Sequence, residues 1–277
     1  PEDPEQDLGV LRERIDAALL EIEQSPYADA LVNTSLDMVV PHPERTHWVP
    51  HRLVADPPGK AWQDDDTEAN LVNKLRDVID EAQSEFILVS PYFVPRKRGV
   101  EVFRQLRNRG IDVHVLTNSL ASTDVKAVHS GYVPARKPLL EMGVNLYEVR
   151  ADARIRGTRR SKIYGSLSSL HTKGFIVDRR KVFIGSFNFD PRSAHINTEM
   201  GVLLEAPEMA AELSGGFSEY AERGVNAYVL KLDEKGRIRW IDRQGDKYVE
   251  LEKEPQTSAW DRFVVGFYRI LPIKGQL

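Results

Sequence analysis

Residues 171–190, HTKGFIVDRRKVFIGSFNFD, carry polar side chains whose types suit displacement at a phosphodiester. A neutral imidazole can attack phosphorus directly, so His171 is the candidate nucleophile and would form a phosphohistidine. Lys173 would offer a positive charge and Asn188 an amide donor to the phosphoryl oxygens as charge redistributes. Because the lysine and the amide take the electrostatic role that Mg²⁺ often has, this chemistry requires no metal and no other cofactor.

The pattern of the same stretch predicts a β-hairpin. Residues 175–177 and 182–184 are short apolar runs typical of buried strands, and residues 178–180 between them form a polar turn. His171 and Lys173 share one face of the first strand, because strand side chains alternate between faces.

The second strand of the hairpin would return three further residues to the start of the first, namely Gly185, Ser186 and Asn188. Gly185 would let the backbone come close because it has no side chain. Ser186 is a further candidate donor to the substrate. The hairpin therefore gathers polar groups at one end of a sheet.

The elements around the hairpin alternate regularly. Helices are predicted over 67–82, 100–108 and about 134–142, and strands over 85–90, 111–117 and 144–149. This alternation indicates an α/β fold with a largely buried sheet. Upstream, residues 7–24 have the spacing of an amphipathic helix, and the proline-rich residues 29–60 are predicted to be irregular.

The composition limits the class of protein. The 277 residues carry a formal net charge of −4, so nucleic acid is not the expected partner. The lack of cysteine excludes disulfides and thiolate metal sites, and no run approaches the roughly 20 apolar residues of a spanning helix. The sequence starts at Pro1 without methionine, and we expect it to be a piece of a longer protein.

The full spacing of the hairpin residues resembles a known motif. It runs His, one residue, Lys, four residues, Asp, six residues, Gly-Ser, one residue, Asn, which resembles the HKD motif of the phospholipase D superfamily. The resemblance extends through Asp190, Arg192, Ser193 and a predicted strand over 197–205. It also extends backward to SPYFVP (90–95), LVADPPGK (53–60) and GVNLYE (143–148), which are similar to the C-terminal half of bacterial cardiolipin synthases.

This resemblance implies a phospholipase D-like mixed sheet flanked by helices, with a single HKD half. Residues 1–60 would then be an N-terminal helix and linker left from an upstream half. Residues 61–225 would be the catalytic half-domain, and residues 226–277 would add strands and an amphipathic helix. The activity implied is transfer of a phosphatidyl group from one phospholipid to His171, and then to the primary hydroxyl of phosphatidylglycerol or glycerol.

The resemblance also implies roles for carboxylates and for a further cation. In the family a carboxylate downstream of the motif pairs with the nucleophilic histidine, and Glu199 holds that place on the next predicted strand. Asp178 belongs to the motif, but it lies at the far end of its strand, roughly 20 Å along the chain, and would bond turn or interface groups. Arg192 would contribute to substrate binding.

The family builds its active site from two HKD motifs, whereas this sequence holds one. None of the remaining histidines is followed two positions later by lysine; they are His42, His47, His51, His114, His129 and His195. The second motif is expected from an upstream half, or else from a second copy of the chain across a two-fold axis.

Two further stretches could contribute to substrate binding. His129 and Tyr132, in AVHSGYVPAR, could line the pocket, or His129 could be a satisfied structural histidine. The basic segment RIRGTRRSK at 154–162 could clamp a lipid headgroup, or it could be a solvated loop.

A helix is predicted after Thr257-Ser258 near the end of the chain. Its apolar stripe comprises Trp260, Phe263, Val264, Phe267, Ile270 and Leu271. The stripe could dock on the core or lie in a membrane interface.

Three functions remain open from the residues and the resemblance. The first is a cardiolipin synthase-like phosphatidyltransferase that acts at a membrane surface, bound peripherally to the cytoplasmic face of a bacterial inner membrane. The second is a homodimeric phosphodiesterase or nuclease that uses water as the acceptor. The third is an inert half-domain that only binds lipid.

Overall fold

The computed structural model describes residues 48–62, 70–152, 169–224 and 226–271, together with a few residues between 9 and 20. Residue contacts divide the chain into a unit of residues 1–48 and a unit of residues 49–277. The helix predicted over 7–24 lies largely outside the described residues. The basic segment 154–162 lies wholly outside them.

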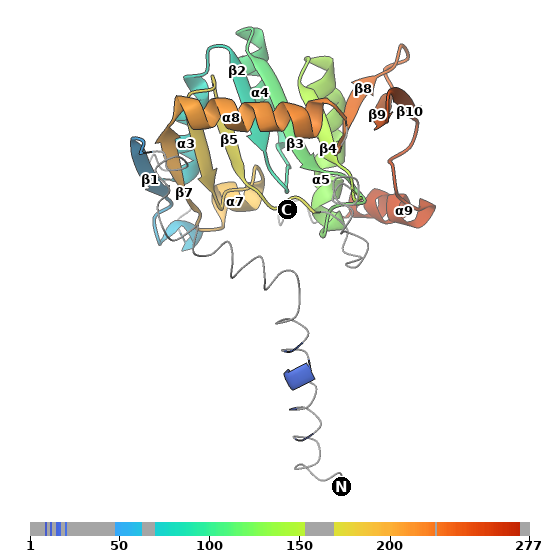
Figure 1. Cartoon of the computed structure of the whole chain (residues 1–277), viewed down its shortest axis with the longest axis horizontal. Coiled ribbons are helices and arrows are strands. Elements are labelled where there is room, and N and C mark those ends of the chain that lie inside the picture. Colours follow the sequence, from blue (N-terminus) through green and yellow to red (C-terminus); the bar gives the residue numbers. More distant parts are fainter. Residues whose placement is uncertain are drawn as a thin grey trace. The chain divides into compact units, whose positions relative to one another are not determined.

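The second unit is built on one ten-stranded sheet with the order β1-β7-β6-β5-β2-β3-β4-β8-β9-β10 (Figure 1). The strands are β1 (His51–Ala55), β2 (Glu85–Val89), β3 (Asp112–Asn118), β4 (Asn145–Val149), β5 (Gly174–Val177), β6 (Lys181–Gly185), β7 (Met200–Glu205), β8 (Ala227–Leu232), β9 (Ile238–Gln244) and β10 (Lys247–Leu251). Strands β2, β3 and β4 are parallel, and every other pairing is antiparallel.

Helices cover both faces of the sheet. The helices are α3 (Leu71–Asp80), α4 (Arg96–Asn108), α5 (Lys126–Glu141), α7 (Pro191–His195), α8 (Pro207–Phe217) and α9 (Ala259–Tyr268), with short turns η1 (Lys60–Trp62) and η2 (Ser218–Glu222). In Figure 1, α8 crosses the near face of the sheet, and α3, α4 and α5 lie behind it. None of the helices in the described ranges is long and apolar enough to cross a membrane.

Strand alternation divides the core between the two faces. In β2, Phe86 and Leu88 join the cluster that also contains the apolar side chains of α3, α4 and α5. Ile87, between them, joins the cluster under α8 and η2. The apolar runs of the sequence form central strands because both faces are covered. The predicted mixed sheet flanked by helices is confirmed.

The boundaries of several elements differ from those predicted. Helix α5 begins at Lys126, eight residues before the predicted start, and it continues through Pro134 and Pro138. The prediction was wrong because it used Pro134 as a helix start, whereas this helix tolerates the lost N–H groups.

The stretch 29–60 is not irregular throughout, since β1 lies within it. Pro50 and Pro57 flank this strand without interrupting its antiparallel pairing with β7. The same sheet also includes β8–β10, so it crosses both predicted boundaries, after residue 60 and after residue 225. The assignment of separate roles to residues 1–60, 61–225 and 226–277 stays a prediction.

Candidate phosphoryl-transfer site

The candidate site lies where the carboxyl ends of β2 and β3 meet the start of β5. The side chain of Asn118, the last residue of β3, holds the chain just before His171. Its Oδ1 accepts from the backbone N–H of Leu170 at 2.9 Å, and its Nδ2 donates to the Leu170 carbonyl at 3.2 Å. Sequence reasoning missed Asn118, whose signal was an amide placed directly after a buried apolar strand.

His171 and Lys173 lie together at this edge. The Lys173 Nζ is 3.5 Å from the His171 Nε2 and donates to the His171 carbonyl at 3.0 Å. His171 is exposed, whereas Lys173 is half-buried. Partial burial lowers the pKa of Lys173 below its usual value, and the negative charges of Glu199, Asp124 and Asp190 partly oppose that shift. The arrangement gives an accessible imidazole beside a partly desolvated cation.

Asn188 follows β6, the strand that pairs with β5, and its side chain carries an unsatisfied polar atom. It is 7% exposed, and its Oδ1 is buried without a hydrogen-bond partner among the described residues. The backbone is held from two sides, because the Asn188 N–H donates to the Ser193 Oγ at 3.2 Å and the neighbouring Phe189 N–H donates to the Ser90 Oγ at 3.0 Å. The backbone of Asn188 is thus fixed, and its unpaired Oδ1 is an acceptor without a donor among the described residues.

Glu199 precedes β7 and is buried. Its carboxylate accepts a short hydrogen bond from the Ser186 hydroxyl, one from the Ser193 Oγ at 2.8 Å and one from the Asn197 Nδ2 at 3.3 Å. No hydrogen bond joins it to His171 in the described structure. Glu199 therefore reaches the site through Lys173, whose pKa it influences, and through Ser186.

A buried ion pair supports Glu199 from behind. The Lys60 Nζ lies 2.7 Å from the Asp56 Oδ2, and both side chains are almost fully buried. Asp56 accepts from the backbone N–H of Glu199 at 2.9 Å, and Lys60 donates to the Ser193 carbonyl at 2.7 Å. Both residues belong to the LVADPPGK stretch, but their spacing alone did not predict this role.

Gly185 is required by the approach of two strands. A Cβ on Gly185 would lie 2.4 Å from the carbonyl oxygen of Met200 and 2.8 Å from the Cα of Gly201. Ser186 accepts from the Met200 N–H at 3.1 Å, so β6 and β7 meet closely at this point. The lack of a side chain at Gly185 therefore allows β6 to approach the backbone of β7 closely.

Asp178 lies at the other end of β5 and adopts a positive φ of 52°. Its carboxylate accepts from the backbone N–H groups of Gln83, Ser84 and Glu85 at 2.9, 2.7 and 3.0 Å. Although its partial burial opposes the shift, these bonds lower its pKa below the usual value. Asp178 thus ties the β5–β6 turn to the start of β2.

The short helix α7 follows the motif. Asp190 caps it by accepting from the Ser193 N–H at 2.8 Å, and burial raises the Asp190 pKa above its usual value. Arg192, in the same helix, is exposed. Its cation can therefore reach an anionic ligand from solvent.

Tyr92 and Asp124, which were not predicted from the sequence, form a hydrogen-bonded pair, and the charge of Asp124 acts on Lys173. The Tyr92 hydroxyl donates to the Asp124 carboxylate at 2.9 Å. Burial, together with the hydrogen bond and negative charge of Asp124, raises the pKa of Tyr92 to about 12. Tyr92 therefore remains a protonated donor at neutral pH.

His129 and Tyr132 do not line an open pocket. Both are buried in α5, where the His129 Nε2 lies 2.9 Å from the Arg136 Nη2 and 3.5 Å from the Glu254 Oε1. The Arg136 guanidinium also bonds Glu148 at 2.8 Å and lies over the Tyr132 ring. Their placement as substrate-binding residues was wrong, because α5 turns both side chains toward this interior network.

Across the described residues, no group of three or more His, Asp or Glu side chains is arranged to hold a metal ion.

Comparisons with known proteins place this geometry in a family. The family model described as "Cardiolipin synthase, PLD-like domain" matches residues 75–221. Cardiolipin synthase C of Escherichia coli is 38% identical over 260 residues, which cover 92% of this chain and 52% of that protein. Cardiolipin synthase A of Proteus mirabilis is 27% identical over 176 residues, which cover 64% of this chain and 32% of that protein. The chain spans about half the length, or less, of these relatives.

A solved structure shares the fold. The phosphatidylserine synthase of Haemophilus influenzae matches with a TM-score of 0.56 at 16% identity, over 84% of this chain and 49% of that protein. At that identity the match shows the fold alone. Since the family model covers more than half of the chain, the chain belongs to the family described as "Cardiolipin synthase, PLD-like domain", within the phospholipase D superfamily.

Proposed function

We propose that this chain is one half of a cardiolipin synthase-like phosphatidyltransferase and supplies one of its two HKD motifs. The observation that carries the proposal is the Lys173 amine 3.5 Å from the His171 imidazole at one edge of the sheet, in a chain 38% identical to a cardiolipin synthase. Asn188, after the strand that pairs with β5, is proposed to complete the site. The substrate class is phospholipid.

The proposed reaction has two displacements at phosphorus. In the first, the His171 imidazole forms a nitrogen–phosphorus bond while the bond to the leaving glycerol oxygen breaks. Lys173 and the Asn188 amide stabilise the phosphoryl oxygens. An acid opposite His171 protonates the alkoxide. In the second displacement, the primary hydroxyl of phosphatidylglycerol or glycerol gives its proton to that same group, now a base, and its oxygen bonds to phosphorus while the nitrogen–phosphorus bond breaks and frees His171.

The opposing acid is proposed to come from a second HKD motif. This motif would belong to an upstream half or to a second copy of the chain. The first source is supported by the relative from Escherichia coli, of which the chain covers 52%. We further propose that Glu199 favours the charged form of Lys173 and holds Ser186 in position, because its negative charge raises the pKa of Lys173 and its carboxylate accepts from the Ser186 hydroxyl.

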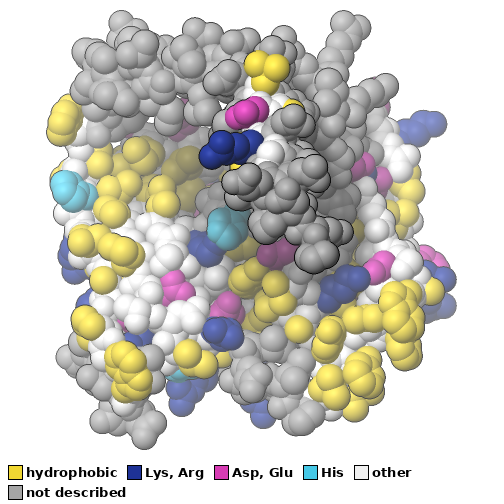
Figure 2. Space-filling view, turned by 90° about the horizontal axis from the view of Figure 1, so that it is seen from below, with side chains coloured by type: hydrophobic (Ala, Val, Ile, Leu, Met, Phe, Trp, Pro, Cys, Tyr) yellow, Lys and Arg dark blue, Asp and Glu magenta, His cyan; other side chains and the backbone are white. Residues whose placement is uncertain are grey.

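The enzyme is proposed to work at a membrane surface, bound peripherally to the cytoplasmic face of a bacterial inner membrane. Support comes from α9, where Trp260 and Phe263 are stacked side by side and are 67% and 60% exposed. Figure 2, which views the molecule from below, shows hydrophobic side chains gathered at the lower right. This is the side on which Figure 1 places α9. Exposed aromatic side chains of this kind suit a lipid interface.

The test is covalent trapping in a protein that carries this chain together with a second motif. After incubation with phosphatidylglycerol, we expect an acid-labile phosphatidyl adduct on the peptide that contains His171, and cardiolipin as product. His171→Ala should abolish both. Glu199→Gln should lower turnover at least a hundredfold with the fold intact.

Asp178→Asn serves as the matched control, because it also changes a carboxylate of the motif region. It should lower stability while leaving turnover per folded molecule within tenfold of wild type. Turnover by His171→Ala within tenfold of wild type would rule out the proposed nucleophile. Phosphatidic acid as the only product would show that water is the acceptor.

A further inference from the structure

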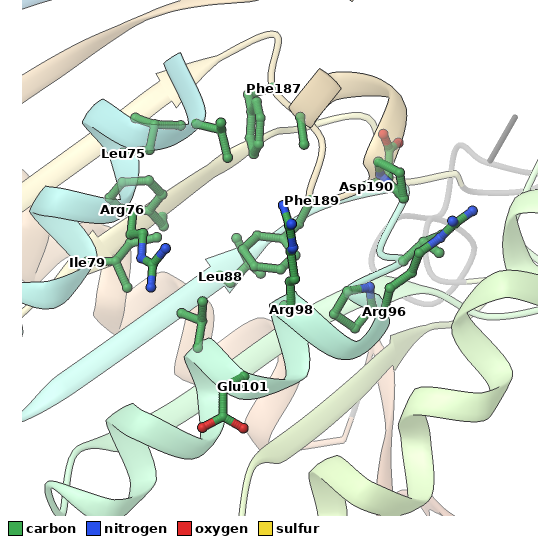
Figure 3. A pocket seen from close by; sticks show the side chains of 18 of the residues that line it. Leu75, Arg76, Ile79, Leu88, Arg96, Arg98, Glu101, Phe187, Phe189 and Asp190 are labelled. Atoms are coloured by element: carbon green, nitrogen blue, oxygen red, sulfur yellow. The ribbon is translucent and has the colours of Figure 1, made fainter. Parts of the chain in front are cut away.

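An apolar pocket opens beside the candidate site, between α3 and α4. Its volume is about 640 Å³, within the range of small-ligand sites. Figure 3 shows Leu75 and Ile79 of α3 on one side, with Leu88 of β2 and Phe189 at the base. Phe187 also faces into this space. The walls and base formed by these residues are aliphatic and aromatic, so this part of the pocket suits a hydrocarbon better than a polar substrate.

The pocket adjoins the phosphoryl-transfer residues. Phe187 and Phe189, which line it, are the neighbours of Asn188, and Gly174 follows Lys173 directly. Lys173 also shares its strand face with Phe175, another lining residue, because the ladder extends to Lys173 through a bond from the Gly185 N–H to the Lys173 carbonyl at 3.2 Å. A lipid whose phosphate is bound by Lys173 can therefore extend along the same face into the pocket.

The mouth of the pocket is rich in cations. Arg76 lies on α3. Arg96, Lys97 and Arg98 lie in the first turn of α4, and this turn contains no acidic residue. Helix N-termini normally disfavour cations, so this concentration of positive charge is suited to an anionic ligand layer.

The acidic side chains among the lining residues are already engaged. Glu101 lies 3.1 Å from Arg104, and Asp190 caps α7. Among the cations, the Arg76 Nε lies 3.9 Å from the Asp80 Oδ2, and both of these side chains are exposed. An apolar chamber with a cationic mouth is the complement of an acyl chain attached to an anionic headgroup.

We propose that this pocket holds one acyl chain of the phospholipid whose phosphate reacts at His171, with the cations at its mouth facing the anionic headgroups. This inference rests on the proposed function for the identity of the lipid. It adds a binding site that draws a single lipid out of the bilayer and aligns its phosphate with Lys173. We expect an acyl chain to occupy the pocket. The alternative occupant that the test distinguishes is a protein segment of an upstream half.

The test measures binding, so it does not depend on turnover. Monomeric phosphatidylglycerols with butanoyl, hexanoyl and octanoyl chains are titrated into the chain by calorimetry, below their micelle concentrations. We expect affinity to rise about fourfold for each methylene group buried, since each contributes about 0.8 kcal/mol. His171→Ala should show the same dependence on chain length, because the pocket lies apart from the nucleophile.

Two variants fill the pocket from opposite walls, Val102→Trp on α4 and Val72→Trp on α3. Each should reduce the octanoyl affinity to the butanoyl level. Leu213→Trp, on the exposed surface of α8, is the matched control and should bind as wild type does. Circular dichroism checks that each variant is folded, and the second wall variant serves if the first is not.

A second measurement identifies the occupant in a protein that carries both motifs. Phosphatidylglycerol with a photoreactive group at the end of one acyl chain should label peptides of α3 and α4. Affinity independent of chain length, unchanged binding by both folded wall variants, or labelling that avoids α3 and α4 would each overturn the inference. Loss of cardiolipin synthesis with chain-length dependence retained would instead count against the proposed function alone.

Discussion

Lys173 is the residue of the site whose charge depends most on its surroundings. Partial burial lowers its pKa, and the carboxylates of Glu199, Asp124 and Asp190 raise it again in part. Its usefulness in phosphoryl transfer depends on the protonated amine. A lysine loses its charge as pH rises through its pKa. The lowered pKa of Lys173 therefore lowers the pH above which this amine is neutral and no longer stabilises the phosphoryl oxygens.

We predict that Lys173 titrates below the usual pKa of a lysine and at lower pH than Lys181. The measurement is ¹³C NMR of a lysine-labelled sample, with Lys173→Arg identifying the resonance. Glu199→Gln should lower the Lys173 pKa further, because it removes a negative charge that favours the protonated amine. Lys181, whose bond to Glu81 raises its pKa, is the internal control. Titration of Lys173 together with Lys181 would contradict the prediction.

At this scale, the sequence indicated the groups proposed to do the chemistry but not the groups that hold them. The HKD spacing identified His171, Lys173 and Asn188, since a two-residue period fixes which side chains share a strand face. Asn118 and the Asp56–Lys60 pair could not be found in this way. Their roles depend on contacts such as that from Lys60 to the Ser193 carbonyl, 133 residues away.

Helix α9 shows how an element can be held rigidly while its apolar face stays uncovered. Ser258 and Asp261 form a reciprocal capping box, and Lys126 of α5 lies 2.6 Å from Asp261. Val265 is buried, whereas Trp260 and Phe263 are exposed. Of the two alternatives left open by the sequence, core docking therefore fails for most of the stripe. Periodicity located the stripe but could not show which part faces the sheet.

We predict that the double variant Trp260→Ser and Phe263→Ser weakens binding to phosphatidylglycerol vesicles at least tenfold. Burying one large aromatic side chain contributes about 1.5–3 kcal/mol, so two lost side chains exceed that factor. Vesicle sedimentation measures the change. Tyr248→Ser removes a similarly exposed aromatic group from β10 and should leave binding unchanged. Equal binding by the α9 variant and wild type would assign this face to a protein contact.

The same scale explains where the element boundaries were missed. The predicted alternation of helices and strands gave the central sheet correctly, because buried strands and amphipathic helices have distinct periods. Strand β1 was missed because its HRLVA sequence is short and lies between prolines. Only its pairing with β7, some 150 residues later, makes it a strand.

For the whole molecule, the central question is where the second motif comes from. One copy of this chain supplies one imidazole, one amine and one amide at the sheet edge. The leaving glycerol alkoxide needs a proton, and no second imidazole lies beside His171 among the described residues to give it. Under the proposed mechanism, a single copy therefore supplies the nucleophile but not the acid that the leaving group needs.

We predict that the isolated chain, as a monomer, shows no phosphatidyl transfer on phospholipid vesicles. Loss of general acid catalysis typically costs 10² to 10⁴-fold, and loss of the second lysine and amide weakens oxyanion stabilisation as well. The assay should follow cardiolipin formation while light scattering records the mass of the chain in the same samples. Turnover that persists in a dimer and disappears on dilution to monomer would show that two copies pair their motifs. Turnover by the monomer itself would contradict the two-motif mechanism, because the acid would then have to lie within this chain.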